Sequence, residues 1–122
     1  MIHETHAIRL TAAWERSERG HWQRSFGRPS GLTAEHRVLL IVAGATELPR
    51  LLLNGMPLGV ADEGDPRRHV WDVTGRLAHR NTLEWVRERG NGEPPASGRT
   101  ALPPACGEVA VEILETPSVN NA

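Results

Sequence analysis

Short segments of alternating apolar and polar residues, separated by glycines and prolines, make up most of this chain. The 122 residues include 12 Gly and 9 Pro. The segments 21–26, 69–73, 82–87 and 109–114 all show a period of two. That period places alternate side chains on opposite faces of a strand, whereas an amphipathic helix has a period near 3.6. The sequence therefore predicts an all-β protein of seven or eight short strands.

Two further segments predict how the strands are arranged. Residues 38–43 are apolar on both faces, which is typical of a strand covered on each side in the middle of a sandwich. Asn54-Gly55 lies between two apolar runs, and both residues tolerate the positive φ that a type I′ hairpin turn requires. Residues 12–19 lack β-branched side chains and precede Gly20, so this segment stays open between helix and strand. These features predict a two-sheet antiparallel β-sandwich.

One domain accounts for the whole length. We expect a single sandwich domain over residues 1–115, followed by a polar C-terminal tail at 116–122. The stretch 90–107 holds four Gly and four Pro, and we interpret it as a long surface loop within the domain. A chain of this size can bury an adequate core without disulfide or metal. The residues expected in the centre of that core are Val38, Leu40, Val42, Val111 and Ile113.

Charge and cysteine content exclude several classes of function. The 14 basic side chains, all arginine, face 15 acidic ones, and the formal net charge of -1 leaves no broad basic field for nucleic acid. Cys106 is the only cysteine, so an internal disulfide is impossible. The first twenty residues lack the charged start and apolar run of a secretory signal, and no run is long enough to cross a membrane. We expect a cytoplasmic protein without a membrane partner.

Three stretches carry a resemblance to a known family. They are HWQRSFGRPSGL at 21–32, LLLNGMPLG at 51–59 and WDVTGRLAHRNTL at 71–83. Their order and spacing resemble the sugar-binding domain of family 2 glycoside hydrolases, a member of the galactose-binding-domain-like superfamily. The resemblance implies a β jelly roll from about Trp22 to Thr82, continuing through a last strand to Glu115. In those enzymes the catalytic carboxylates lie on a separate barrel, so the resemblance implies no glycosidase activity here.

The remaining motifs give no catalytic or metal site. No GxSxG nucleophile motif is present, and Cys106 lies in a proline-rich segment. His3, Glu4 and His6 lack the spacing of a helical zinc site, and we interpret them as a solvated N-terminal segment. The acids of the loop ADEGDPRR at 61–68 offer fewer ligands than the six to eight oxygens that Ca²⁺ takes. We therefore expect neither catalysis nor a cofactor, with a structural calcium ion at this loop as the less favoured alternative.

The same loop is the candidate ligand site. Carbohydrate-binding proteins stack sugar rings on exposed aromatic side chains and bind hydroxyl groups with polar ones. Trp22, Trp71 and Trp85 share strand faces with apolar residues and are expected in the core or at its edge, whereas Trp14 is the tryptophan expected to be exposed. The predicted ligand-binding residues are Asp62, Asp65, Arg67, His69 and Trp14.

Two hypotheses about function follow from these predictions. In the first, the chain is a non-catalytic carbohydrate-binding module with a glycan ligand on the loop at 62–69. In the second, it is a protein interaction or assembly module with no sugar ligand. Its sheet edges or the loop at 90–107 would then contact a protein partner. The oligomeric state is left open.

Overall fold

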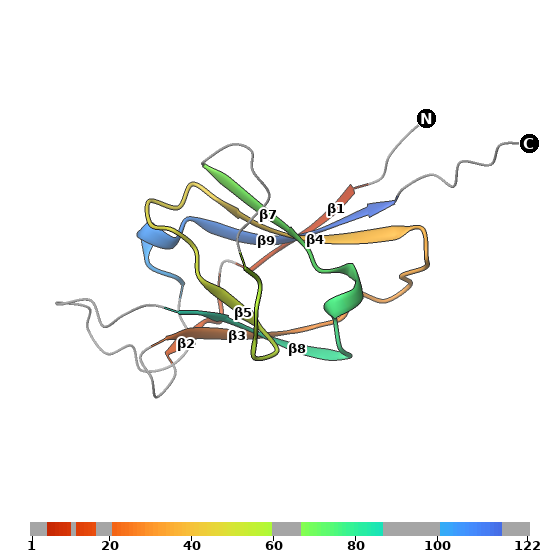
Figure 1. Ribbon diagram of the computed structural model, residues 1–122, viewed down its shortest axis with the longest axis horizontal. Helices are drawn as coiled ribbons and strands as arrows, with labels where there is room; N and C mark the ends of the chain where they lie inside the picture. The colour runs from red at the N-terminus through yellow and green to blue at the C-terminus, as the bar shows by residue number, and fades with distance from the viewer. Residues whose placement is uncertain (1–4, 11, 17–20, 60–66, 87–100, 116–122) are drawn as a thin grey trace, which may run out of the picture.

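The computed structural model describes residues 5–10, 12–16, 21–59, 67–86 and 101–115, which form two antiparallel sheets packed face to face (Figure 1). The first sheet has the strand order β1 (Thr5–Arg9), β9 (Glu108–Glu115), β4 (His36–Ala43) and β7 (Arg68–Asp72). The second has the order β2 (Glu15–Arg16), β3 (Trp22–Gly27), β8 (Arg80–Trp85), β5 (Leu51–Leu53) and β6 (Met56–Pro57). Two short 3₁₀ turns, η1 (Thr74–Arg76) and η2 (Pro104–Cys106), complete the elements. The prediction of an all-β, two-sheet sandwich is confirmed.

Strands from early and late parts of the chain alternate within each sheet. β9 lies between β1 and β4, and β8 lies between β3 and β5, with antiparallel pairing throughout. This interleaving is the double Greek key of a jelly roll, with β2 added at one edge. In the part of the chain that the structure describes, no helix is long and apolar enough to cross a membrane.

The core lies between the two sheets and is built from the inward half of each alternating pattern. Four of the five predicted core residues, Val38, Leu40, Val42 and Val111, are almost fully buried. Ile113 is only half-buried, because it pairs with the exposed edge strand β1 near the end of β9. The expected burial of three tryptophans is confirmed, with exposed fractions of 4% for Trp22, 6% for Trp71 and 1% for Trp85.

Residues 12–16 belong to the segment for which the sequence left helix and strand open, and they lead from the first sheet into β2 of the second. Ala13 has a φ of 65°, and this turn brings Trp14 inward, where it is 0% exposed. Its indole Nε1 donates to Leu10 O at 2.7 Å, and Arg24 Nε donates to Ala12 O at 2.7 Å. Desolvation lowers the pKa of the inward-facing Arg24 guanidinium, which remains charged. The prediction that Trp14 is exposed is therefore wrong.

The predicted hairpin is confirmed and is anchored more firmly than a turn alone would be. Asn54 and Gly55 have φ values of 52° and 81°, and the strands β5 and β6 pair on either side. Asn54 Nδ2 donates to Asn81 Oδ1 at 2.9 Å, while Asn54 Oδ1 accepts from Thr82 N at 2.9 Å. The buried Asn81 also bonds both backbone groups of Ala78. These bonds fix the hairpin to the start of β8.

The described part of the predicted loop, residues 101–107, packs onto the sandwich. Cys106 is 0% exposed and Leu102 packs against the core. Ala105 O accepts a backbone hydrogen bond from Thr46 N at 2.9 Å. A Cβ at Gly107 would collide with the backbone of Ala43, so a larger side chain is excluded there. Residues 90–100 lie outside the described ranges.

On the outer face of the first sheet, charged side chains form ion pairs with one another. Ile41 pairs with Val70 on β7 and with Ala110 on β9, so Arg68 and Glu112 lie diagonally on either side of it. Arg68 Nη2 reaches Glu112 Oε2 at 3.5 Å across β4. The bridge therefore crosses the outward side of Ile41, which is 4% exposed although it points away from the core.

Asp72 holds the turn after β7. Asp72 Oδ1 accepts hydrogen bonds from Thr74 N at 3.0 Å and from the Thr74 hydroxyl at 2.5 Å. Its other oxygen, Oδ2, accepts from the Arg37 guanidinium. The hydroxyl bond lowers the pKa of Asp72 most; partial burial opposes that shift, and the Thr74 N–H and Arg37 add to it. Asp72 therefore holds the start of η1 and links it to β4 through Arg37.

Candidate functional site

The structure describes three of the five predicted ligand-binding residues, Arg67, His69 and Trp14, and buries one of them. Arg67 is exposed just before β7, and His69 is half-buried on the inner side of that strand. The His69 ring stacks on Trp71, with ring centroids 6.2 Å apart. Trp14 is buried, so it cannot offer a stacking surface. Asp62 and Asp65 lie outside the described residues, and a ligand role for Arg67 and His69 stays a prediction.

A different polar surface lies on the outside of the second sheet, where β3 and β8 pair. We call it the β3–β8 face and define it by the outward side chains Gln23, Ser25, Arg80, Thr82 and Glu84. The register pairs Gln23 with Glu84, Ser25 with Thr82, and Gly27 with Arg80. Four residues of strand separate the first row from the last, so the face is about 13 Å long. That length is sufficient for a short oligosaccharide.

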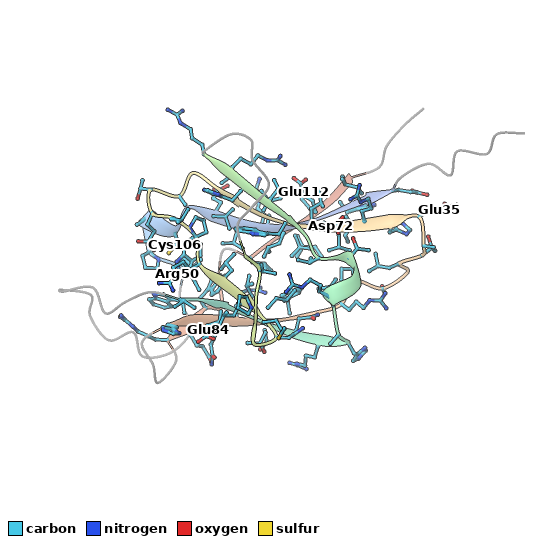
Figure 2. The ribbon with its side chains drawn as sticks, in the orientation of Figure 1. Glu35, Arg50, Asp72, Glu84, Cys106 and Glu112 are labelled. Atoms are coloured by element: carbon cyan, nitrogen blue, oxygen red, sulfur yellow. The ribbon has the colours of Figure 1, made fainter. Side chains whose placement is uncertain are left out.

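Glu84 lies near the end of the central strand of the second sheet. β8 is the third of five strands, and Glu84 has Gln23 on one side and Leu52 on the other. Glu84 Oε1 lies 2.9 Å from His21 Nδ1, and the two side chains are 20% and 19% exposed. Figure 2 shows Glu84 on the opposite outer surface of the sandwich from Glu112.

The second oxygen of Glu84 is the acceptor of this face. Among the described residues His21 is the one hydrogen-bonding partner of the carboxylate, and it holds Oε1. Oε2 is therefore available to accept a hydrogen bond from a ligand. A carboxylate oxygen is a stronger acceptor than a neutral one, because the bond is charge-assisted.

The other side chains of the face are also available for hydrogen bonding. Within the described ranges, the side chains of Gln23, Ser25 and Thr82 form no hydrogen bond with the protein. In the part of the chain that the structure describes, the hydrogen bonds that involve Ser25 and Thr82 use their backbone groups. An amide and two hydroxyl groups thus lie in adjacent rows beside the carboxylate, and each of them can both donate and accept.

An apolar border continues the row that contains Glu84. Leu52 pairs with Glu84 on one side and with Pro57 on the other. Leu52 is half-buried and Pro57 is exposed, so both can contact the C–H groups of a ligand. No described tryptophan is exposed on this or any other surface. Ligand contact here relies on hydrogen bonds and aliphatic packing rather than on aromatic stacking.

The sequence predicts the polar side of each of the two strands, but it does not predict that the two sides form one face. The alternation placed Gln23 and Ser25 opposite Trp22, and it placed Thr82 and Glu84 opposite Trp85. Each half is an ordinary solvated strand surface. The pairing of β3 with β8 joins the two halves into one surface. The His21–Glu84 contact on this surface links residues that are 63 positions apart in the sequence.

The described residues hold no metal-ligand cluster of three or more His, Cys, Asp or Glu side chains. Asp62, Glu63 and Asp65, the acids considered as calcium ligands, lie outside the described ranges. So do His3 and Glu4 of the N-terminal segment.

Comparison of the chain with known proteins gives remote likenesses. No family model matches the sequence, and no curated protein matches it. A crystal structure of BuGH86wt in complex with neoagarooctaose covers 93% of this chain, with 15% identity and a TM-score of 0.48. A variant of that protein in complex with the same oligosaccharide covers 93% with 17% identity and a TM-score of 0.48. The chain spans 19% of the length of each of those chains.

Proposed function

We propose that the protein is a non-catalytic carbohydrate-binding module that holds a saccharide on the β3–β8 face. The observation that carries this proposal is the cluster of unengaged polar groups there: the Gln23 amide, the Ser25 and Thr82 hydroxyls, and Glu84 Oε2. A saccharide presents hydroxyl groups at close intervals along one side, which these groups can bind. The sequence resemblance to a sugar-binding jelly roll supports the same function.

Each element of the face has a separate role in this proposal. Glu84 Oε2 accepts from a sugar hydroxyl, and His21 keeps the carboxylate in position by holding Oε1. Ser25 and Thr82 exchange hydrogen bonds with the hydroxyls of the next ring. Leu52 and Pro57 pack against the apolar side of a ring, as aliphatic groups can do without a specific geometry.

Calorimetric titration with neutral oligosaccharides tests the proposal. Glu84→Gln keeps the size of the side chain and removes the charge, so we expect affinity to fall about tenfold, because a charge-assisted bond becomes a neutral one. Thr82→Ala removes one hydroxyl and has a smaller effect in the same direction. Thr46→Ala is the matched control, because Thr46 is an exposed threonine in the connection between β4 and β5.

The outcomes separate the proposal from its rivals. Binding that is weakened in the Glu84 and Thr82 variants and unchanged in the Thr46 variant supports a saccharide site on the β3–β8 face. The proposal fails if no oligosaccharide binds at millimolar concentration. It also fails if binding is unchanged in Glu84→Gln while the variant has the wild-type melting temperature.

A further inference from the structure

Three basic residues lie at the end of the second sheet where β3 ends and β8 begins. Arg80 pairs with Gly27 in the last row of the β3–β8 face, and Arg28 N donates to His79 O at 3.0 Å. Arg28, His79 and Arg80 are all exposed. The two segments that meet here, 21–34 and 73–83, contain no Asp or Glu. Of these residues Arg80 belongs to the β3–β8 face, and Arg28 and His79 lie in the adjacent row of the strand pair. We call the three residues the basic end of the second sheet.

The positive charge of the basic end is not neutralised within the described part of the chain. None of its three side chains forms an ion pair or hydrogen bond with a described residue. Arg37 and Arg68, by contrast, pair with Asp72 and Glu112. The side chains of Arg9 and Arg50 also lack a described partner, but neither residue lies at this end of the second sheet. The protein therefore leaves positive charge open at one end of the same surface that carries the unengaged polar groups.

The surface beside Arg80 is open. Its partner across the strand pair is Gly27, which has no side chain, and no atom lies within 4 Å of the point where a Cβ would be. A guanidinium group with free space beside it can form two parallel hydrogen bonds to a carboxylate or a sulfate. The geometry points to an anionic group of the ligand beside Arg80.

We infer that the ligand is an acidic saccharide, with a single carboxylate or sulfate group at the basic end and hydroxyl groups along the remaining rows. This inference rests on the proposed function. Glu84 lies at the other end of the face, about 13 Å away along β8. Its carboxylate repels a ligand that is anionic along its whole length, such as nucleic acid or a densely sulfated polymer. The ligand therefore has one charged end and one neutral end.

Three trisaccharides test the inference by calorimetry. One is neutral, the second has a uronate as its terminal ring, and the third has a single sulfate ester on its terminal ring. Each is titrated into the wild type and into the variants Arg80→Gln, Arg28→Gln and Arg9→Gln. Arg9 is the matched control, because it is an exposed strand arginine on the first sheet.

We expect at least one anionic trisaccharide to bind about tenfold more tightly than the neutral one. The carboxylate and sulfate arms identify which group is preferred. Arg80→Gln removes this advantage, Arg28→Gln reduces it, and Arg9→Gln leaves it unchanged. Raising the salt from about 50 mM to about 300 mM also reduces the advantage, because the interaction is exposed to solvent.

The results distinguish failure of the inference from failure of the proposed function. Equal affinity for all three trisaccharides, together with weaker binding in Glu84→Gln, overturns the inference and leaves the function standing. An equal loss of neutral and anionic binding in Arg80→Gln also overturns it. If none of the three trisaccharides binds, both the function and the inference are wrong.

Discussion

On the outer face of the first sheet, charged side chains bind one another, whereas on the β3–β8 face polar and charged groups are left open. Arg68 and Glu112 close over Ile41, which is 4% exposed, and Arg37 binds Asp72. On the second sheet, Thr82 stands exposed in a comparable outward position. Alternating strands produce both surfaces, so the difference lies in whether the polar groups find partners within the protein. A surface whose groups lack such partners is the better candidate for a ligand.

The largest expected effect compares one outward residue from each sheet. Ile41→Ala should lower the free energy of unfolding by about 2–4 kcal/mol, because it leaves a cavity beneath the Arg68–Glu112 bridge. Thr82→Ala should change it by less than about 0.5 kcal/mol, because no described group depends on its hydroxyl. Denaturation in urea measures both values. Similar losses in the two variants would contradict the contrast between the faces.

Asn81 tests how the β3–β8 face is held in shape. Asn81→Ala should cost about 2–3 kcal/mol, because the Ala78 backbone groups and the Asn54 amide lose their partners at a site that is 1% exposed. Asn54→Gly is the control, since glycine keeps the positive φ and removes one side chain. Thermal unfolding should show a smaller loss for the control. A larger loss in Asn54→Gly would show that Asn81 is not the centre of this network.

Gly55 tests the hairpin that borders the face. Gly55→Val should cost about 1–2 kcal/mol, because a β-branched residue resists the φ of 81°. Gly75 also has open space around its Cα, but its φ is not positive, so Gly75→Val should cost less. The difference in melting temperature between the two variants measures the turn. Equal melting temperatures would argue against a strained substitution at position 55.

The smallest expected effect is the pH dependence of the Arg37–Asp72 ion pair on the first sheet. Because the pKa of Asp72 is lowered in the folded state, its stabilisation is present above the unfolded pKa, about 3.9, and is lost as the pH falls through the folded value. Asp72→Asn should therefore be less stable than wild type at pH 6, by less than about 1 kcal/mol for this exposed pair. The difference should become smaller as the pH falls below about 3.9. A difference that is constant between pH 3 and pH 6 would contradict an ionised role for Asp72.

The fold was largely predictable because strand alternation records which side of each strand is buried. Trp22, Trp85 and Val111 were assigned to the core from this pattern, and the turn at Asn54-Gly55 from its conformational preference. Trp14 was not predictable, because its burial depends on the positive φ of Ala13 and on a carbonyl partner at Leu10. Such a local reversal leaves no periodic signal in the sequence.

The candidate site was less predictable because it depends on strand pairing and on charge distribution. Ser25 and Thr82 lie far apart in the sequence, and each belongs to an ordinary polar strand surface. Similarly, the formal net charge of -1 excludes a broad basic field but does not show that Arg28 and Arg80 meet at one end of a sheet. The sequence indicated a ligand loop at residues 62–69 because charged residues are consecutive there.

Nuclear magnetic resonance of the isotope-labelled protein, titrated with the trisaccharide that ends in a uronate, tests the central claim most directly. We predict that the amide signals of Ser25, Thr82 and Glu84 shift with a common affinity, while those of Ile41 and Val70 on the opposite outer face do not move. Shifts confined to the first sheet, or to the rim at Arg67 and His69, would contradict the assignment of the ligand to the β3–β8 face.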